Sequence, residues 1–331
     1  MKAPGIAIIG ASHWHVPLYV TGLKELGVKV CGVHDDDPAA AGRVAGELGA
    51  PVFDGVDDLL DKARPDFVFA FAPHSRMPEL AKKLIGRKIA FAIEKPVGLS
   101  HGQVHELAGL AEKQGVFCSI PFVWRYSEAV KQLKSRIRAG DYVHLAFRFV
   151  AGPPGRYLEN GSPWMLDIRQ VGGGCMTNLG VHFLDLALHL TESTELAVLS
   201  AAFHYSHGYS VEDYSAVQLA APGEVSVSIE TGYAFPMHGG QKRDNRWTLV
   251  TRDGYHTLSD NGLTLRFIRQ PPETLAVTAD SDDLYPVFVR ETLAEWADGR
   301  KPRADLWQMA RVRKILDQIN ETARGREPSD A

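Results

Sequence analysis

The fold class follows from residues 6–15, which read IAIIGASHWH. The four apolar residues from Ile6 to Ile9 are typical of a strand that is buried on both faces. They end at Gly10, which matches the first position of the G-x-G-x-x-G dinucleotide-binding fingerprint. Ser12 and His15 replace the second and third glycines, so the motif alone is a weak indication. A strand, a tight turn and a helix are the expectation for this stretch.

The next hundred residues repeat the same alternation of strand and helix. Short apolar runs rich in β-branched or aromatic residues occur at 28–33, 67–72, 89–93 and 116–120. Helical patterns lie between the runs, near 16–26, 38–48, 56–63, 76–86 and 100–114. This order predicts an α/β fold, with an N-terminal Rossmann domain built on a doubly wound parallel sheet and covering residues 1–122.

A different rhythm predicts a second domain over residues 123–331. Helices are expected near 127–139, 178–190, 286–298 and 305–324. Strands are expected at 143–150, 197–205, 214–220, 224–232, 246–251, 255–258 and 263–268. In one of them Val225, Val227 and Ile229 alternate with serines, which is typical of a half-exposed strand. These elements predict a C-terminal α+β domain with a large, mostly antiparallel open sheet.

Composition excludes several classes of protein. The 331 residues carry 36 Lys and Arg against 40 Asp and Glu, a net charge of −4 that supplies no cationic surface for nucleic acid. With 45% apolar residues the chain can form a core, and disorder is excluded. The three cysteines form no disulfide framework, which favours a reducing cytoplasm. No segment approaches 18 consecutive apolar residues, so we expect no membrane partner.

Asp35 indicates the cofactor. It follows the second predicted strand, where a carboxylate can accept hydrogen bonds from the hydroxyls of an adenosine ribose. Together with Asp36 and Asp37 it would repel a 2′-phosphate, which favours NAD over NADP. The alternative is that Asp36 and Asp37 only cap the next helix.

Two further motifs carry candidate chemistry. Glu94-Lys95-Pro96 follows a predicted strand, at the sheet edge where open parallel sheets bind ligands, and Lys95 could present its ammonium to a substrate hydroxyl. Gly172 to Gly174 lead into a helix that places Asn178, His182, Asp185 and His189 on one face. Such a polar stripe lines a site, holds a metal ion or forms a bonded network in the core.

Together these motifs resemble the Gfo/Idh/MocA oxidoreductases, a family that includes inositol dehydrogenases and glucose–fructose oxidoreductases. The resemblance rests on E-K-P after a Rossmann half and on G-G-G-x-x-x-[D/N]-x-G-x-H-x-x-D some 75 residues later. It extends to Ala72-Pro73, Trp124-Arg125-Tyr126 and Val211-Glu212-Asp213-Tyr214. The resemblance implies an NAD-dependent dehydrogenase acting on a hydroxyl of a sugar, polyol or related compound.

Three positions carry over as the catalytic set. The resemblance implies that Lys95 binds the reacting hydroxyl and that His182 takes its proton as general base. The third position is usually Asp in the family and is Asn178 here, so it would orient the substrate without ionising. Candidate cofactor-binding residues are Gly10, Ser12, His13, Trp14, Asp35, Pro73, His74, Glu94, Lys95 and Pro96. Candidate substrate-side residues are Arg125, Tyr157, Trp164, Asp167, Tyr233 and His238.

Other functions remain open at this point. Relatives in the family also carry out net hydrolysis or epimerisation with NAD recycled within one turnover, and a non-catalytic NAD-binding or sugar-binding sensor is a third possibility. The family commonly pairs the open face of the second sheet in a homodimer or homotetramer. We expect the alternating strand of Val225, Val227 and Ile229 to supply an apolar face for such pairing.

Overall fold

The computed structural model describes residues 4–237 and 241–325, which form two compact units. Unit 1 contains Met1–Pro121, Tyr157–Met165 and Leu284–Ala310. Unit 2 contains Phe122–Arg156, Leu166–Asp283 and Arg311–Ala331. The first change of unit falls next to the predicted boundary at residue 122. Two later segments belong to unit 1, and the predicted division did not include them.

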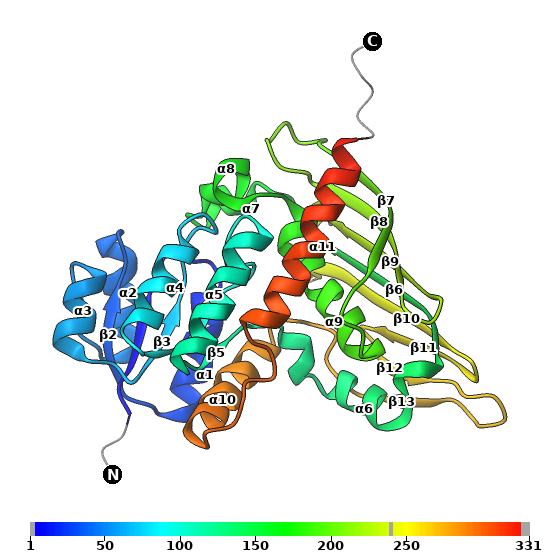
Figure 1. The fold of residues 1–331 in the computed structure, drawn as a ribbon, viewed down its shortest axis with the longest axis horizontal. Coiled ribbons are helices and arrows are strands. Elements are labelled where there is room, and N and C mark those ends of the chain that lie inside the picture. Colours follow the sequence, from blue (N-terminus) through cyan, green and yellow to red (C-terminus); the bar gives the residue numbers. More distant parts are fainter. Residues whose placement is uncertain (1–3, 238–240, 326–331) are drawn as a thin grey trace. The chain divides into compact units, whose positions relative to one another are not determined.

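Unit 1 is built on a parallel sheet of five strands in the order β2-β1-β3-β4-β5 (Figure 1). The strands are β1 (Ile6–Ile9), β2 (Val30–His34), β3 (Phe67–Ala70), β4 (Ala90–Ile93) and β5 (Cys118–Ser119). The helices are α1 (Val16–Leu26), α2 (Pro38–Leu48), α3 (Val56–Ala63), α4 (Met77–Gly86), α5 (His101–Gln114) and α10 (Leu284–Ala297). The predicted parallel Rossmann sheet is therefore confirmed.

Local sequence signals explain where these helices begin and end. Asp37 caps α2, since its carboxylate accepts a hydrogen bond from the Ala39 N–H at 2.9 Å. Gly27 and Gly49 end α1 and α2 in the left-handed conformation. Helix α10 packs on α1 because Gly22 leaves room for Pro286; a Cβ on Gly22 would lie 2.9 Å from the Pro286 Cα. The distant segment Leu284–Ala310 thus joins unit 1.

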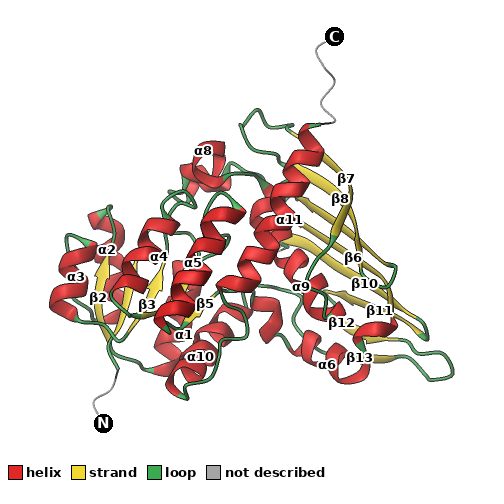
Figure 2. Cartoon of the chain, in the orientation of Figure 1, coloured by secondary structure: helices red, strands yellow, loops and turns green. Residues whose placement is uncertain are grey.

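Unit 2 is built on an eight-stranded sheet, drawn as one layer of yellow strands in Figure 2. Its order is β13-β12-β11-β10-β6-β9-β8-β7, and all pairs except β6 with β9 are antiparallel. The strands are β6 (Tyr142–Ala151), β7 (Ala197–His204), β8 (Tyr214–Ala221), β9 (Val225–Gly232), β10 (Arg243–Thr251), β11 (Gly254–Ser259), β12 (Gly262–Leu265) and β13 (Glu273–Leu275). The predicted large, mostly antiparallel sheet is confirmed.

The helices of this part of the chain are α6 (Glu128–Arg136), α7 (Arg156–Glu159), α8 (Ile168–Val171), α9 (Val181–Thr191) and α11 (Leu306–Arg324), of which α7 and α11 extend over both units. Helix α9 packs on the sheet through β6. Phe183 of α9 stacks on Phe147 of β6 with ring centroids 5.2 Å apart. No helix within residues 4–237 and 241–325 is long and apolar enough to cross a membrane.

One expectation about the sheet is wrong. Val225, Val227 and Ile229 are buried in the core of unit 2, so they do not supply an apolar face for pairing with another copy. The neighbouring Ser226 is exposed instead. The alternation correctly predicted a strand with two unlike faces, but its apolar side chains are already used within the chain.

Candidate functional site

A cavity of about 300 Å³ lies in unit 1, where the ends of β1, β2 and β3 meet. Parallel strands collect ligands at their carboxyl ends, so the position is the one expected for a dinucleotide. The cavity is lined by predicted cofactor residues and by residues that the sequence did not single out. They include Gly10, Ser12, His13, Asp35, Asp36, Pro73, Arg76, Lys83 and Trp164.

Gly10 makes the turn out of β1 possible. Its φ is 90°, and a Cβ there would lie 2.1 Å from the carbonyl oxygen of Phe71. The two chain segments are close because the Phe71 N–H donates to the Ile9 carbonyl at 2.8 Å. A side chain would therefore force the β1 and β3 ends apart, and the first fingerprint glycine keeps its usual role.

Ser12 and Asp35 join the turn to the end of β2. The backbone N–H and the hydroxyl of Ser12 donate to Oδ2 of Asp35 at 2.7 and 2.8 Å, and the Asp37 N–H donates to Oδ1 at 2.7 Å. A carboxylate offers about four acceptor positions, so Asp35 retains capacity for a ribose hydroxyl beside these three bonds. The residues present fit the adenosine half of NAD.

Asp36 and Asp37 have separate structural roles. Asp37 caps α2, as the alternative interpretation of the sequence proposed. Asp36 forms an ion pair with Arg76 at 2.7 Å, and this hydrogen bond lowers the pKa of the Asp36 carboxyl. Arg76 thus places a cation in the cavity beside Asp35 and Asp36, which the sequence analysis did not foresee.

Aromatic rings line the part of the cavity near the turn. His13 lies among Trp14, Phe71 and Trp164, with ring centroids 5.4 to 5.9 Å away. Burial holds the pKa of His13 well below its usual range. The His15 N–H points to Nδ1 of His13 at 3.2 Å, which places the proton of the neutral imidazole on Nε2. The rings of His74 and Trp164 also lie edge to face.

Lys95 is buried directly after β4. Burial lowers its pKa to about 8, and the charge of Glu94 opposes that effect. The Glu94 carboxylate accepts hydrogen bonds from the Tyr19 hydroxyl at 2.8 Å and from the Lys95 N–H at 3.2 Å. The Lys95–Pro96 peptide bond is cis. Lys95 is therefore an ammonium group held inside the protein rather than a surface lysine.

In unit 2 the glycine-rich segment folds tightly around Glu212. The Glu212 carboxylate accepts hydrogen bonds from the N–H groups of Gly174 at 2.5 Å and Met176 at 3.0 Å. A Cβ on Gly174 would lie 1.9 Å from the Glu212 carbonyl oxygen. Burial raises the pKa of Glu212 to about 7, although the backbone donors act in the opposite direction.

This turn leads into a π-helical segment, Met176–Gly180, that continues as α9. The segment carries Asn178, whose amide nitrogen donates to the Tyr233 hydroxyl at 3.0 Å. One turn later His182 is almost buried, and its ring lies edge to face with Phe122 at 6.3 Å. The structure therefore places Asn178 against Tyr233 and His182 one helical turn further along the same segment of unit 2.

Comparison with known proteins identifies the family. Residues 5–122 match the model of the Gfo/Idh/MocA oxidoreductase family with an NAD-binding Rossmann fold, and residues 128–256 match its C-terminal domain. The chain belongs to the Gfo/Idh/MocA family. NAD, the predicted cofactor, is the one named in the description of this family.

Individual relatives of this Gfo/Idh/MocA protein are distant. The rhizopine catabolism protein MocA of Rhizobium meliloti is 28% identical over 55% of this chain and 56% of its own length. The scyllo-inositol 2-dehydrogenase (NAD(+)) of Bacillus subtilis (strain 168) is 24% identical over 67% and 65%. The chain thus spans between about half and two thirds of the length of these curated relatives.

A solved structure shares the fold. GenD2 from gentamicin A biosynthesis, in complex with NAD, superimposes with a TM-score of 0.83 at 20% identity, covering 98% of this chain and 96% of its own. At that identity the likeness concerns the fold.

In this Gfo/Idh/MocA protein, Asp185 and His189 form the later part of the predicted polar stripe, on α9 beyond Asn178 and His182. Asp185 is bound by Arg125 through Nε at 2.8 Å and a terminal nitrogen at 2.6 Å. Burial raises the pKa of Asp185, with Arg125 opposing it, and burial lowers the pKa of His189 to about 3. Among residues 4–237 and 241–325, no group of His, Cys, Asp and Glu could hold a metal ion. Asp185 thus belongs to a bonded network.

The remaining predicted substrate residues belong to both units. Tyr157 and Trp164 lie in unit 1, where the ring of Tyr157 meets Trp14. Asp167 caps α8 and is bound by Arg169, which lowers its pKa to about 2. His238 lies outside the described residues.

Glu212 was the main omission of the sequence analysis. Its motif was noted as part of the resemblance, but no role was assigned to the carboxylate. The signal was the pair of acidic residues Glu212 and Asp213 between Val211 and Tyr214, because a carboxylate buried at the start of a strand requires hydrogen-bond donors from elsewhere in the chain.

Proposed function

We propose that this chain is an NAD-dependent dehydrogenase that oxidises a hydroxyl group of a sugar, polyol or related compound. The observation that carries the proposal is the buried Lys95 with a pKa of about 8 in a Gfo/Idh/MocA chain. The relatives support the substrate class, because two proteins of Bacillus subtilis (strain 168) are by name a scyllo-inositol 2-dehydrogenase and a glucose-6-phosphate 3-dehydrogenase.

Lys95 binds the hydroxyl that reacts. At pH 7 an amine with a pKa of about 8 is mostly protonated, so it donates a hydrogen bond to the hydroxyl oxygen. This donor stabilises negative charge as it develops on the oxygen, and it acts strongly because the group is buried. Bound NAD would supply the hydride acceptor.

His182 accepts the hydroxyl proton, and Asn178 orients the substrate. A neutral imidazole suits proton transfer near pH 7. The Tyr233 hydroxyl holds the nitrogen end of the Asn178 amide, which turns the amide oxygen to serve as an acceptor for substrate. Asn178 carries no charge, so the proton chemistry falls to His182 and Lys95.

Asp35 supports a preference for NAD over NADP. Its carboxylate lines the cavity, where hydrogen bonds from Ser12 and Asp37 hold it in place. A 2′-phosphate would meet this carboxylate at close range, and Arg76, the cation beside it, is already paired with Asp36. Thermal-shift measurements with NAD and NADP test this choice, and stabilisation by NADP alone would contradict it.

The decisive experiment compares Lys95→Ala with Lys113→Ala, an exposed lysine of α5. A panel of polyols, aldoses and sugar acids is followed through NADH absorbance. We expect Lys95→Ala to lower kcat/KM at least about 100-fold while NAD binding by calorimetry persists, and Lys113→Ala to match the parent. Equal activity in Lys95→Ala would refute the assignment. Product formation without accumulating NADH would favour the NAD-recycling alternative.

We also propose that the protein works as a homodimer or homotetramer in a reducing cytoplasm. Its three cysteines, Cys31, Cys118 and Cys175, form no disulfide bond among the described residues, which suits such a compartment. Because the apolar side chains of β9 are buried, any sheet-to-sheet contact would use the polar side with Ser226. Sedimentation velocity at micromolar concentration decides between monomer and oligomer.

A further inference from the structure

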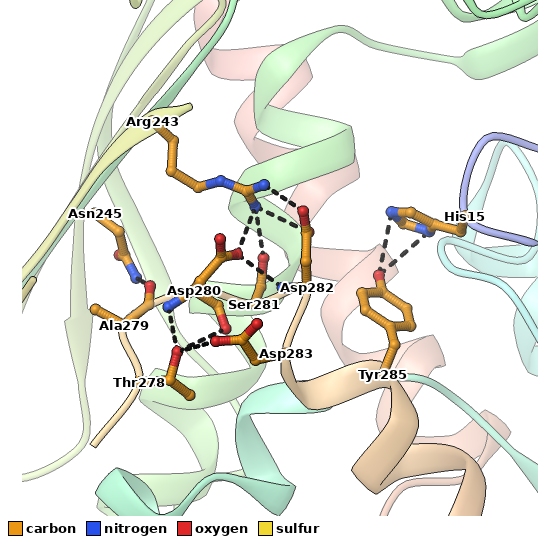
Figure 3. Close-up of polar contacts among 10 residues, drawn as sticks. All are labelled: His15, Arg243, Asn245, Thr278, Ala279, Asp280, Ser281, Asp282, Asp283 and Tyr285. Atoms are coloured by element: carbon orange, nitrogen blue, oxygen red, sulfur yellow. Dashed lines mark hydrogen bonds and ion pairs between the residues drawn. The ribbon is translucent and has the colours of Figure 1, made fainter. Parts of the chain in front are cut away.

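A buried polar network stands where the dinucleotide fingerprint has its third glycine. His15 occupies that position and is 3% exposed. Its Nδ1 lies 2.9 Å from Oε1 of Glu94. The hydroxyl of Tyr285 lies 3.2 Å from both Nδ1 and Nε2 of the same ring (Figure 3). The side chain that replaces the third glycine is thus bonded to the carboxylate next to Lys95.

The donors and acceptors in this network follow from the chemistry of each group. A carboxylate only accepts hydrogen bonds, so Nδ1 of His15 is protonated and donates a hydrogen bond to Glu94. Nε2 is then the acceptor for the Tyr285 hydroxyl. The hydroxyl of Tyr19 donates to the same Oε1 atom of Glu94 at 2.8 Å. The opposite oxygen, Oε2, accepts from the Lys95 N–H at 3.2 Å.

Three segments of unit 1 contribute to this arrangement. The turn before α1 supplies His15, α1 supplies Tyr19, and α10 supplies Tyr285, each of them buried. The buried carboxylate of Glu94 is thereby held in one orientation by two side-chain donors, the His15 ring and the Tyr19 hydroxyl.

We propose that Glu94 is a positioning residue for Lys95, and that His15 holds Glu94 in place as a hydrogen-bond donor at the position of the missing third glycine. The inference rests on the proposed function only in that Lys95 is taken to bind the reacting hydroxyl.

The proposal links the charge of Glu94 to the protonation of Lys95. The charge that acts on Lys95 is that of Glu94, and His13 is in turn within reach of Glu94, Lys95, His15 and His74. Burial lowers the pKa of Lys95 and the Glu94 carboxylate raises it. Removing that charge therefore moves the pKa of Lys95 further down, by about one pH unit or more for a close opposite charge.

The test uses four full-length variants. His15→Gly restores the fingerprint glycine and removes the donor to Glu94. His15→Asn keeps an N–H close to the place of Nδ1. Glu94→Gln removes the charge, and Tyr285→Phe removes only the partner of His15. Steady-state kinetics against pH gives kcat and KM for NAD, and carbon-13 NMR of labelled lysines, assigned with Lys95→Ala, gives the pKa of Lys95 without turnover.

We expect His15→Gly to lower kcat at pH 7 about tenfold or more while KM for NAD stays level or falls, because glycine suits the dinucleotide turn. His15→Asn should recover most of that loss, and Tyr285→Phe should have the smallest effect. In Glu94→Gln the Lys95 signal should titrate at least about one pH unit lower.

Equal losses in His15→Gly and His15→Asn would overturn the proposal, as would an unchanged Lys95 titration in Glu94→Gln. If His15→Gly does not fold, the Glu94→Gln titration and the Tyr285→Phe kinetics decide alone. An active Lys95→Ala enzyme would instead refute the proposed function, and the NMR titration would still decide whether Glu94 positions Lys95.

Discussion

Replacing Glu212 by Gln tests the support of the glycine-rich turn in unit 2. The carboxylate accepts hydrogen bonds from the N–H groups of Gly174 and Met176 through its two oxygens. Gln offers one acceptor oxygen, and its NH₂ group would face one of these backbone donors. Losing one bond and leaving a buried N–H without a partner costs about 1–3 kcal/mol.

The same carboxyl group makes the stability of the wild type depend on pH. Its pKa is about 7 in the folded protein and about 4.5 in the unfolded chain, because burial disfavours the charge. Between these values the folded state binds more protons than the unfolded state, so stability falls as pH rises. At about 1.4 kcal/mol for each pH unit, this loss amounts to roughly 3 kcal/mol between pH 4.5 and 7.

Gln does not titrate, so the two proteins should respond differently to pH. We expect Glu212→Gln to be less stable than the wild type by about 1–3 kcal/mol at pH 5 and equally or more stable at pH 8. Urea unfolding at pH 5, 6, 7 and 8 measures this, with m-values compared throughout. Glu224→Gln, at an exposed site, is the matched control. A stability difference between wild type and Glu212→Gln that is constant across this range would refute the reasoning.

Three further predictions concern the two units. Gly10→Ala should destabilise the protein by at least about 2 kcal/mol, because the added Cβ meets the Phe71 carbonyl. Gly46→Ala in α2, where a Cβ meets nothing within 4 Å, should instead stabilise the protein by up to about 1 kcal/mol. Thermal unfolding measures both changes. Asp35→Asn should weaken NAD binding about tenfold and reduce the preference for NAD over NADP, as calorimetric titrations with both cofactors would measure. An unchanged ratio of the two dissociation constants would show that Asp35 does not select the cofactor. Asn178→Asp should add an ionisation to the pH profile of kcat, and an identical profile would show that the uncharged residue does not alter proton handling.

The fold was predictable because each element carries its own signal. Apolar runs of four to six residues gave the parallel strands, and Asp37, Gly27 and Gly49 marked helix ends where the structure has them. Alternation in β9 correctly predicted one buried and one exposed face. Which face meets solvent and which meets helices depends on packing with distant segments, so the apolar face was misplaced.

The site was only partly predictable, for the same reason. Lys95, Asp35 and His182 occupy positions defined by short motifs, but their partners are far away in sequence. Tyr285 contacts His15 across 270 positions, and Arg76 reaches Asp36 across 40. Nothing local to Tyr285 or Arg76 distinguishes them from other helix residues. Pairings of this kind follow from the tertiary structure alone.

The incomplete glycine fingerprint illustrates what decides whether a motif position can vary. At Gly10 the neighbouring group is a backbone carbonyl 2.1 Å from a would-be Cβ, and a backbone segment within a sheet cannot move aside. At positions 12 and 15 the chain instead places hydrogen-bond donors, Ser12 facing Asp35 and His15 facing Glu94. Each replacement is matched by a carboxylate at the end of another strand. The presence of these two carboxylates, rather than the number of glycines, is therefore the feature to look for when judging whether a related chain retains the turn.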